Sequence, residues 1–352
     1  MYMNILPIAQ LSTSIPLNIV FVVASVFLLW FGADWLVKGA SKMALSMNLQ
    51  PIIIGLTVVA FGTSAPELVV SVTAALKGGP EMALGNVVGS NIANIALVLG
   101  VCALICPIEV SKDTLKTDLP FMVLVSFLTY VLARFGPAGG GTGLNQLDGI
   151  IMLGFLVYFL LRIFLKNRNS KEVDPELAEI MEEKKSSNAM NFVLVLAGII
   201  GLVAGATLLV EGGVVIAGAM GVPEFFISLT MVAIGTSIPE LAASAMAAYK
   251  GETDLCMGNI VGSNIMNLLI VLAITVVIAP IAVSPNIIQF ELPAVVIVAI
   301  LLYFMCRLGK LKLGKKAGVI LLLVYVSFIY LSYKKPSVQA PQGTAPIEQA
   351  AK

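Results

Sequence analysis

The sequence predicts an all-α polytopic membrane protein, with ten transmembrane helices arranged as two inverted five-helix repeats. Three observations lead to this prediction. First, 59% of the 352 residues are hydrophobic and only 12% are charged, and the mean hydropathy is +0.99. Second, apolar runs of about 20 residues, each long enough to cross a bilayer, recur from end to end. Third, much of the first half of the chain returns in the second half at a constant offset.

Ten apolar segments are candidate transmembrane helices. In chain order they are 17–38, 51–76, 81–106, 119–135, 148–166, 191–218, 223–249, 254–279, 291–307 and 317–333. Residues 1–16 contain neither Lys nor Arg, so the first span lacks the positively charged region of a cleavable signal peptide. We therefore expect it to remain as a transmembrane helix.

The repeat is visible in two motifs that recur at a shift of 173 residues, since residue 62 corresponds to residue 235. GTSAPEL at 62–68 returns as GTSIPEL at 235–241, and GNVVGSNIAN at 85–94 returns as GNIVGSNIMN at 258–267. The shift holds without a gap from the first span to the fourth. Each copy has five spans, and because five is odd the second copy enters the membrane from the opposite side. Inverted repeats of this kind build many secondary transporters, with the substrate site near the midplane.

The repeat also divides the chain. We expect a first repeat at 1–166 with its motif region at 60–94, a connector at 167–190, a second repeat at 191–333 with its motif region at 233–267, and a tail at 334–352. The connector mixes both signs of charge, which favours a solvated segment. The tail is rich in Pro, Gln and Ala, which favours disorder.

The distribution of Lys and Arg predicts the orientation. With the N-terminus outside, the cytoplasmic loops collect most of the 21 basic residues, including six from Arg162 to Lys185 and five from Arg307 to Lys316. Positive charge accumulates on the cytoplasmic side of membrane proteins. We therefore expect a multi-pass protein of the cell (plasma) membrane whose 167–190 connector is cytoplasmic.

Several function classes are disfavoured by composition. The chain has no histidine, which excludes an HExxH zinc site, and it has no CxxC motif. The four cysteines, Cys102, Cys106, Cys256 and Cys306, lie in or beside spans and are expected to be small apolar packing residues. A net charge of +1 gives no indication of nucleic-acid binding. We expect a non-enzyme without a cofactor or an obligate protein partner, whose surroundings are the lipid bilayer.

The shorter motif places a proline and a glutamate inside an apolar span. Pro66 has no N–H and clashes with the carbonyl of Gly62, so that carbonyl loses its helical partner. Glu67 follows Thr63 by four residues, so both face the same side of a helix. The motif therefore presents carboxylate, hydroxyl and carbonyl oxygens together, and such hard ligands suit Ca²⁺ and Na⁺ better than soft metals.

The longer motif adds a second set of oxygen atoms. Ser90 and Asn94 are spaced i,i+4, as are Ser263 and Asn267. The glycines at 85, 89, 258 and 262 allow helices to approach closely. A single proline kink or a string of small residues is usually structural. Two intramembrane glutamates at equivalent repeat positions, however, are expensive to bury and indicate function.

Other charges within the apolar segments have simpler explanations. Asp34 and Lys38 are spaced i,i+4 and are expected to form a local ion pair. Glu211 has no such partner and is expected near the outer interface. Asp118 and Glu291 lie where the fourth and ninth spans begin.

The two motif pairs resemble the alpha-1 and alpha-2 repeats of the Ca²⁺/cation antiporter superfamily, specifically its prokaryotic sodium/calcium exchanger branch. The resemblance covers the ten-span plan to about residue 333. It implies that the second, third, seventh and eighth spans enclose the ion sites, and that the long first and sixth spans slide as a gate.

The resemblance also implies ligands. For Ca²⁺ they are Glu67, Glu240, Thr63 and Thr236. For Na⁺ the two glutamates are shared, and the further residues are Ala60, Ser64, Ser90, Ala233, Ser237 and Ser263, the two alanines acting through their carbonyls. Asn94 and Asn267 are implied to line the centre. The transported ions are thus Ca²⁺ and Na⁺.

Two differences between this sequence and other branches of the superfamily bear on the identity of the coupling ion. Asn267 stands where some relatives, including potassium-dependent exchangers, carry Asp, which disfavours K⁺ coupling. The string GTSxPE replaces the GNAxE-like string of the proton-coupled branch, which disfavours H⁺ coupling. Na⁺/Ca²⁺ exchange, electrogenic by resemblance, is the leading hypothesis. H⁺- or K⁺-coupled transport of Ca²⁺ or another divalent cation, an intramembrane hydrolase and a cation channel are the alternatives.

Charge favours exchange over a channel. Glu67 and Glu240 bring two negative charges into the membrane, and either one Ca²⁺ or two Na⁺ neutralises them. An empty site would leave unpaired carboxylates in a medium of low dielectric constant, at a cost of several kcal/mol. Occupied sites can therefore change sides more readily than empty ones.

Overall fold

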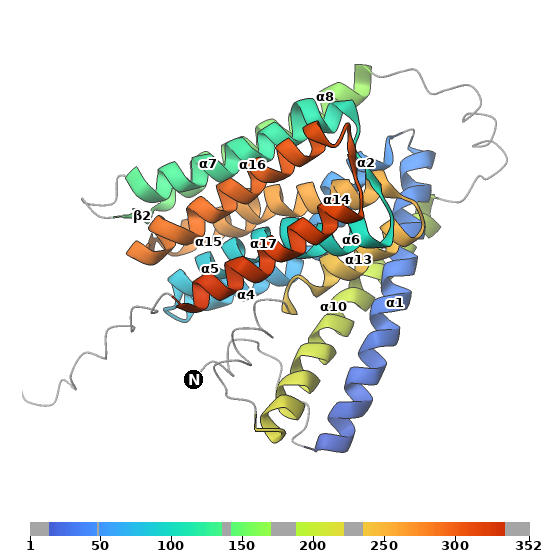
Figure 1. Ribbon diagram of the computed structural model, residues 1–352, viewed down its shortest axis with the longest axis horizontal. Coiled ribbons are helices and arrows are strands. Elements are labelled where there is room, and N and C mark those ends of the chain that lie inside the picture. Colours follow the sequence, from blue (N-terminus) through green and yellow to red (C-terminus); the bar gives the residue numbers. More distant parts are fainter. Residues whose placement is uncertain (1–13, 48, 136–141, 170–187, 222–234, 335–352) are drawn as a thin grey trace, which may run out of the picture.

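The computed structural model describes residues 14–47, 49–135, 142–169, 188–221 and 235–334, and these residues are mostly helical (Figure 1). The longest helices are α1 (Ile15–Ser46) and α10 (Asn188–Ala219). The other helices are α2 (Pro51–Ile54), α3 (Ala60–Thr63), α4 (Ala65–Leu76), α5 (Pro80–Ile92), α6 (Leu99–Ile105), α7 (Leu119–Phe135), α8 (Gln146–Asn169), α13 (Ile238–Tyr249), α14 (Thr253–Met266), α15 (Ala273–Ile278), α16 (Leu292–Leu308) and α17 (Lys315–Lys334).

Short π-helical segments interrupt several of these helices. They are η2 (Gly55–Val59), η3 (Ala93–Val98), η4 (Thr114–Asp118), η6 (Asn267–Leu272) and η7 (Ile287–Glu291). Two antiparallel pairs of very short strands were not expected from the sequence. β1 (Ile108–Glu109) pairs with β4 (Lys312–Leu313), and β2 (Gly143–Leu144) pairs with β3 (Ile281–Ala282). They give the backbone groups of the connecting loops hydrogen-bond partners that the loops cannot supply locally.

Within the described residues, eight helices are long and apolar enough to cross a membrane, or nine if a bent pair counts as one span. The bent pair consists of 51–63 and 65–76, with an angle of 43° between its halves. The chain is a multi-pass membrane protein. The expected span at 223–249 lies partly outside the described residues. Its described part contains the helix α13, and the number ten stays a prediction.

The secondary structure repeats at the offset seen in the sequence. A shift of 173 residues carries the bounds of α1 onto those of α10, α4 onto α13, α7 onto α16, and β1 onto β3. The same shift carries η4 onto η7. Each half therefore breaks its helices at equivalent places, which indicates that the repeated residues act on the backbone in the same way in both halves.

Two spans form the centre of the bundle. The apolar window of the span 80–105 is 72% buried and that of 253–278 is 83% buried, compared with 17% in α1 and 28% in α10. Close approach in the centre depends on glycine, because a Cβ added to Gly258 would lie 2.6 Å from the carbonyl oxygen of Ile52. The expectation that glycines in the longer motif permit close helix contact is met at this position.

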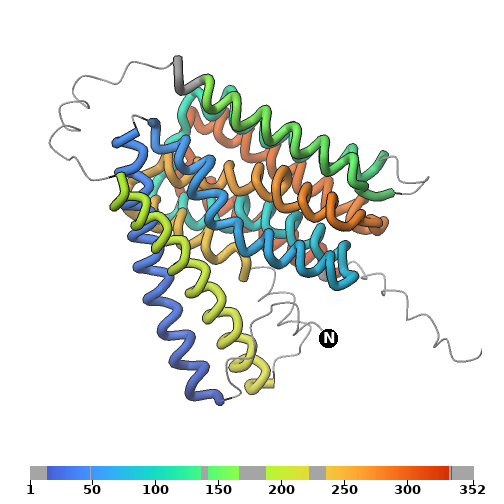
Figure 2. The backbone as a smooth tube through the Cα atoms, turned by 180° about the vertical axis from the view of Figure 1, so that it is seen from behind, coloured from blue at the N-terminus to red at the C-terminus, as the bar shows by residue number. Residues whose placement is uncertain are grey.

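α1 and α10 lie side by side and run in opposite directions, and their far ends project from the rest of the bundle (Figures 1 and 2). Glycine again sets their separation. A Cβ on Gly32 would lie 2.9 Å from the backbone nitrogen of Leu202, and a Cβ on Gly205 would lie 2.9 Å from Leu29 Cγ. Since Gly32 and Gly205 correspond in the repeat, each helix presents the same surface to the other.

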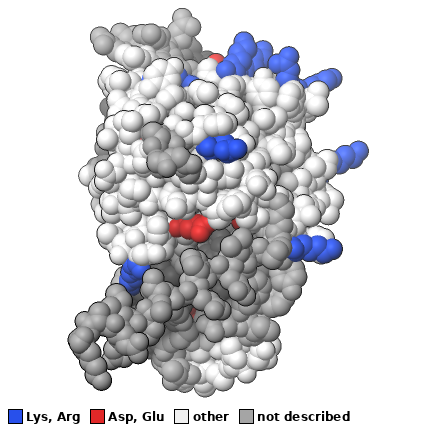
Figure 3. All heavy atoms as spheres, turned by 90° about the vertical axis from the view of Figure 1, so that its left-hand side faces the viewer, with Lys and Arg blue, Asp and Glu red and all other residues white. Residues whose placement is uncertain are grey.

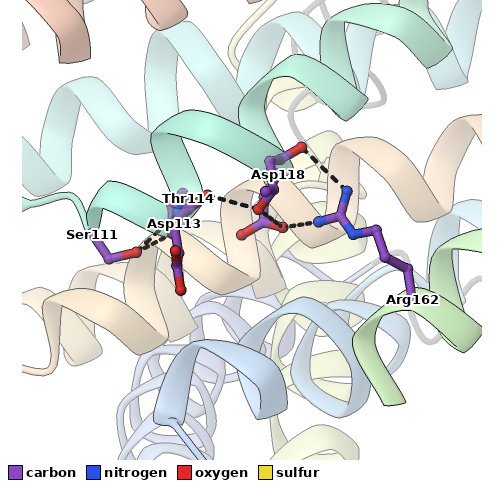
Figure 4. Close-up of polar contacts among 6 residues, drawn as sticks. Ser111, Asp113, Thr114, Asp118 and Arg162 are labelled. Atoms are coloured by element: carbon purple, nitrogen blue, oxygen red, sulfur yellow. Dashed lines mark hydrogen bonds and ion pairs between the residues drawn. The ribbon is translucent and has the colours of Figure 1, made fainter. Parts of the chain in front are cut away.

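Two charged groups within the spans, Asp34 and Asp118, form ion pairs, whereas Glu211 has a buried carboxylate oxygen without a hydrogen-bond partner among the described residues. Asp34 forms the expected ion pair with Lys38, with 2.7 Å between Oδ2 and Nζ. Asp118 was expected only to mark the start of a span, but it forms an ion pair with Arg162 of α8 (Figure 4). Arg162 also donates a hydrogen bond of 3.3 Å to the Thr117 carbonyl. This contact joins the fourth and fifth spans, which the sequence alone did not indicate.

The surface is consistent with lipid contact. Most of the described side chains on the face in Figure 3 are uncharged, and several Lys and Arg side chains gather near one end. Large apolar side chains such as Phe27 and Trp30 of α1 are more than half exposed. All four cysteines are free thiols, and Cys102, Cys256 and Cys306 are buried as expected.

The connector and tail are described only at their edges. The expected connector 167–190 overlaps the end of α8 and the beginning of α10, because both helices continue beyond their apolar segments. Residues 170–187 and 335–352 lie outside the described part of the chain, so the expectations for the connector and for most of the tail stay predictions.

Candidate ion-binding site

The first copy of the shorter motif breaks a membrane helix. α3 ends at Thr63 and α4 begins at Ala65, while Ser64 between them has φ −83° and ψ 4°, outside the helical region. Pro66 follows as the second residue of α4, where a missing N–H costs nothing. Glu67 is therefore the third residue of a helix. Its carboxylate lies at the helix N-terminus, where the backbone N–H groups favour negative charge.

The second copy has the same geometry. Ser237 has φ −88° and ψ 3°, α13 begins at Ile238, and Glu240 is its third residue. Glu67 and Glu240 are both 0% exposed. Two helix N-termini thus present buried carboxylates, and each comes from a different half of the chain.

Few hydrogen bonds from the described residues compensate these carboxylates. The Ser64 hydroxyl donates a hydrogen bond of 3.0 Å to Glu240 Oε1. Both oxygens of Glu67 and the second oxygen of Glu240 have no hydrogen-bond partner among the described residues. Glu67 lies beside Ser90 and Thr236 and close enough to Glu240 for the two charges to interact. Uncompensated oxygens of this kind are what a bound cation would satisfy.

The hydroxyl and amide groups around the carboxylates contact each other across the two halves. The Thr63 hydroxyl donates to Asn259 Oδ1 at 3.2 Å, and the Thr236 hydroxyl donates to Asn86 Oδ1 at 3.3 Å. These hydrogen bonds are equivalent, because Thr63 corresponds to Thr236 and Asn86 to Asn259 in the repeat. Each short motif therefore contacts the long motif of the other half.

The two asparagines are held in turn by serines on the helices of the glutamates. Asn86 donates to Ser71 Oγ at 3.1 Å, and Asn259 donates to Ser244 Oγ at 2.9 Å. Because their amide N–H groups are used in this way, their oxygens point toward the threonines. A chain of three side chains thus fixes each threonine hydroxyl.

The expected serines of the long motif lie in the same network. Ser263 Oγ is 3.4 Å from Thr63 Oγ1, and Ser90 Oγ is 3.4 Å from Thr236 Oγ1. The structure therefore gathers the following expected residues with the glutamates: Thr63, Ser64, Ser90, Thr236 and Ser263.

Other expected site residues are less closely tied to this network. Asn94 and Asn267 are fully buried, and their side chains have no hydrogen-bond partner among the described residues. They lie in η3 and at the start of η6, and π-helical turns are frequent at functional sites. The Ser237 hydroxyl is likewise buried without a described partner.

Two backbone carbonyls, those of Ala60 and Ala233, are expected Na⁺ ligands. The Ala60 carbonyl accepts a hydrogen bond of 3.0 Å from the Ser64 backbone N–H, and the Thr63 hydroxyl oxygen lies 3.4 Å from it. It therefore lies beside the hydroxyl network. Ala233 lies outside the described residues, and its expected role stays a prediction.

Four residues of the network were absent from the site expected from the sequence: Ser71, Asn86, Ser244 and Asn259. A signal for them existed, because Ser71 corresponds to Ser244 and Asn86 to Asn259 at the repeat offset. Asn86 lies four residues before Ser90 just as Asn94 lies four residues after it, so helical spacing alone does not distinguish the two. Contacts between the halves cannot be found by spacing within one helix.

Comparison with known proteins assigns the family. The model of the sodium/calcium exchanger protein family matches residues 17–165 and 190–334, which is most of the chain. This chain belongs to the sodium/calcium exchanger family. The matched ranges include both copies of each motif and leave out much of the connector and the tail.

Two relatives of this exchanger match it over almost their full length. CaxA of Alkalimonas amylolytica is 39% identical over 318 residues, which cover 89% of this chain and 98% of CaxA. The sodium/calcium exchanger MaX1 of Methanosarcina acetivorans is 29% identical over 351 residues, covering 91% of this chain and 99% of MaX1.

A solved structure shows that the exchanger fold is shared. The sodium-calcium exchanger NCX_Mj, in crystals soaked with 10 mM Na⁺ and no Ca²⁺, superimposes with a TM-score of 0.77 at 31% identity. The alignment covers 90% of this chain and 99% of NCX_Mj. The family consists of transporters, and this exchanger is a membrane antiporter for cations, including Ca²⁺.

Proposed function

We propose that the chain exchanges Na⁺ for Ca²⁺ across the membrane by alternating access, and that the exchange is electrogenic. The observation that carries the proposal is the pair of fully buried carboxylates, Glu67 and Glu240, at two helix N-termini within a ring of hydroxyl and amide groups. Related proteins named sodium/calcium exchangers support the choice of ions.

In this proposal Ca²⁺ binds to Glu67, Glu240, Thr63 and Thr236. The Na⁺ ions share the glutamates and use the residues Ala60, Ser64, Ser90, Ala233, Ser237 and Ser263, while Asn94 and Asn267 line the centre. The threonine hydroxyls suit the role, because the asparagine–serine chains hold their oxygens next to the carboxylates. All of these groups are hard oxygen ligands, which Ca²⁺ and Na⁺ prefer.

The charge balance explains why transport would be coupled. Two carboxylates are neutralised by one Ca²⁺ or by two Na⁺, and a third Na⁺ would carry net charge across the membrane. Among the described residues few hydrogen bonds reach the two buried carboxylates, which disfavours crossing without ions. This asymmetry favours exchange over a leak.

The proposed architecture is a pair of inverted five-helix repeats, 1–166 and 191–333, with ten spans in all. Two observations support it. α1 and α10 correspond in sequence and run antiparallel. The Thr63–Asn259 and Thr236–Asn86 hydrogen bonds are exchanged by the same correspondence. Both are expected when two copies are related by a two-fold axis in the membrane plane.

The proposed location is the cell membrane, with the N-terminus outside and the connector in the cytoplasm. The accumulation of Lys and Arg at the loops assigned to the cytoplasm supports this orientation.

The function can be tested in proteoliposomes. ⁴⁵Ca²⁺ uptake is measured with outward gradients of Na⁺, K⁺ or H⁺ imposed one at a time, with and without an imposed membrane potential. The proposal expects uptake with the Na⁺ gradient and a dependence on the potential. Uptake driven equally well by a proton gradient would favour H⁺ as the coupling ion. Uptake that occurs only in the presence of K⁺ would favour K⁺-coupled transport.

A further inference from the structure

α10 contacts the two short motifs through apolar side chains that pack against glycine. A Cβ added to Gly62 would lie 2.3 Å from Ile199 Cδ1, and a Cβ added to Gly235 would lie 2.6 Å from Val210 Cγ2. Both glycines open the short motifs that carry the glutamates, so α10 lies directly on the site. Apolar contacts against glycine are not directional and do little to fix the position of α10 along its own axis.

A directional contact is made by α1. Lys250, the residue after α13, forms an ion pair with Asp34 of α1, with 2.6 Å between Nζ and Oδ1. The same ammonium group donates a hydrogen bond of 3.3 Å to the Asp34 backbone carbonyl. Trp30, one turn earlier on α1, lies 6.2 Å from Tyr249, measured between ring centroids. The end of the helix that begins beside Glu240 is thus attached to α1 by an ion pair and a ring contact.

The ion pair is partly shielded from solvent. The side chains of Asp34 and Lys250 are 20% and 23% exposed, whereas that of Lys38 is 56% exposed. Partial burial strengthens an ion pair relative to a fully exposed one. Asp34 also holds Lys38 through its other oxygen, so its charge keeps one partner if Lys250 moves away. Breaking the Asp34–Lys250 contact therefore leaves no isolated carboxylate.

The second half of the chain does not encode this contact. At the repeat offset Lys250 corresponds to Lys77, but Asp34 corresponds to Thr207, which carries no charge. The Asp34–Lys250 pair itself is therefore not repeated at the offset. A contact that forms at one end of a carrier and must break for the other conformation stabilises one of the two conformations relative to the other.

We propose that Asp34 and Lys250 are positioning residues that hold the α1–α10 pair against the end of α13, stabilising the conformation in which that end is closed. The pair must break for the opposite conformation to form, and Lys38 then keeps Asp34 neutralised. This inference rests on the proposed alternating-access function. It predicts that the pair sets the populations of the two conformations without touching the transported ions.

Transport kinetics test the proposal with the variants Asp34→Asn and Lys250→Gln. Loss of the ion pair lowers the population of the described conformation. The apparent Ca²⁺ affinity, measured from the side of the membrane to which the ion site opens in that conformation, should therefore fall by about two- to tenfold. The double variant should be no weaker than either single variant, because both remove one interaction. Lys250→Arg keeps the charge and should retain wild-type affinity. Lys42→Gln, an exposed lysine of the same helix, controls for charge alone.

A fluorescence measurement is independent of transport. The chain has two tryptophans, and Trp35→Phe leaves Trp30 as the single reporter beside Tyr249. In nanodiscs with brominated lipids, Lys250→Gln in this background should increase quenching of Trp30, and Lys42→Gln should not. If transport fails in the wild type but this difference appears, the proposed function is wrong and the positioning pair stands. Equal quenching and equal affinities in Lys250→Gln and Lys42→Gln would overturn the positioning role.

Discussion

The Thr63 hydroxyl donates a hydrogen bond of 3.2 Å to Asn259 Oδ1, although 196 residues separate the two along the chain. Its counterpart joins Thr236 to Asn86 at 3.3 Å. These contacts tie the broken helix of each half to the central helix of the other.

Glu67→Gln and Glu240→Gln are each expected to abolish Na⁺-driven Ca²⁺ uptake while the protein stays folded. Each change removes one of the two charges that balance Ca²⁺ and keeps the size of the side chain. Uptake of ⁴⁵Ca²⁺ and thermal melting of the purified variants check this expectation. Glu109→Gln, on an exposed surface position, is the matched control and should transport normally. Normal flux in either site variant would remove that glutamate from the site.

Asn86→Ala and Asn259→Ala are expected to weaken Ca²⁺ binding without abolishing transport. Each removes the acceptor that orients a threonine hydroxyl, and a hydrogen bond of this kind contributes about 0.5–1.5 kcal/mol. The apparent KM for Ca²⁺ should rise by about two- to tenfold, to a similar extent in both variants. Asn286→Ala, outside the network, should leave KM unchanged. An effect in only one of the two variants would contradict the equivalence of the two contacts.

Gly258→Ala is expected to destabilise the centre of the bundle. The added methyl group would lie 2.6 Å from a backbone oxygen of Ile52 and 3.0 Å from the Cα of Gly55, and backbone atoms cannot rotate away. Overpacking of this kind costs about 1–3 kcal/mol, so the melting temperature should fall. Gly154→Ala of α8 is the control, because an exposed helical glycine replaced by alanine gains helix propensity. Equal melting temperatures for both variants would show that the central helices can separate.

Transport is expected to be independent of K⁺. Asn267, fully buried at the start of η6, is a neutral amide, and the resemblance to the antiporter superfamily implies an acid at this position in potassium-dependent exchangers. Replacing K⁺ by choline on both sides should leave Na⁺-driven Ca²⁺ flux unchanged. The variant Asn267→Asp adds a carboxylate to the same place and should make the flux sensitive to K⁺ or to protons. Loss of wild-type flux in choline would contradict the prediction.

Protons are expected to inhibit transport by competition. Protonation of Glu67 or Glu240 removes the negative charge that binds the cation, so uptake should fall as the medium is acidified. Because competition follows mass action, saturating Ca²⁺ should restore part of the rate. The chain has no histidine to contribute to such an effect. Inhibition that high Ca²⁺ does not relieve would place the sensitive group elsewhere.

Much of the fold and the centre of the site could be predicted because they depend on local patterns. Apolar runs define spans, and the Gly–Thr–Ser motif with Pro66 predicts a helix break beside Glu67. The crossed contacts could not be predicted in the same way. Asn259 reaches Thr63 only because Gly258 lets α14 approach Ile52 and Gly55, and that distance depends on tertiary packing. The ion pairs of Asp118 with Arg162 and of Asp34 with Lys250 also join residues far apart in sequence, so spacing along one helix gives no signal for them.

The length of α1 and α10 has a consequence for the surrounding lipid. Each has 32 residues, which at about 1.5 Å per residue gives a rod of roughly 48 Å, while the hydrocarbon core is about 30 Å thick. Helices of this length fit a bilayer of that thickness by tilting, by projecting into the headgroups or by locally thickening the membrane. Any displacement of this pair against the bundle changes that hydrophobic mismatch. Acyl-chain length then acts as an effector of the protein, and a cell that alters its lipid chains also alters the work needed to move the two helices.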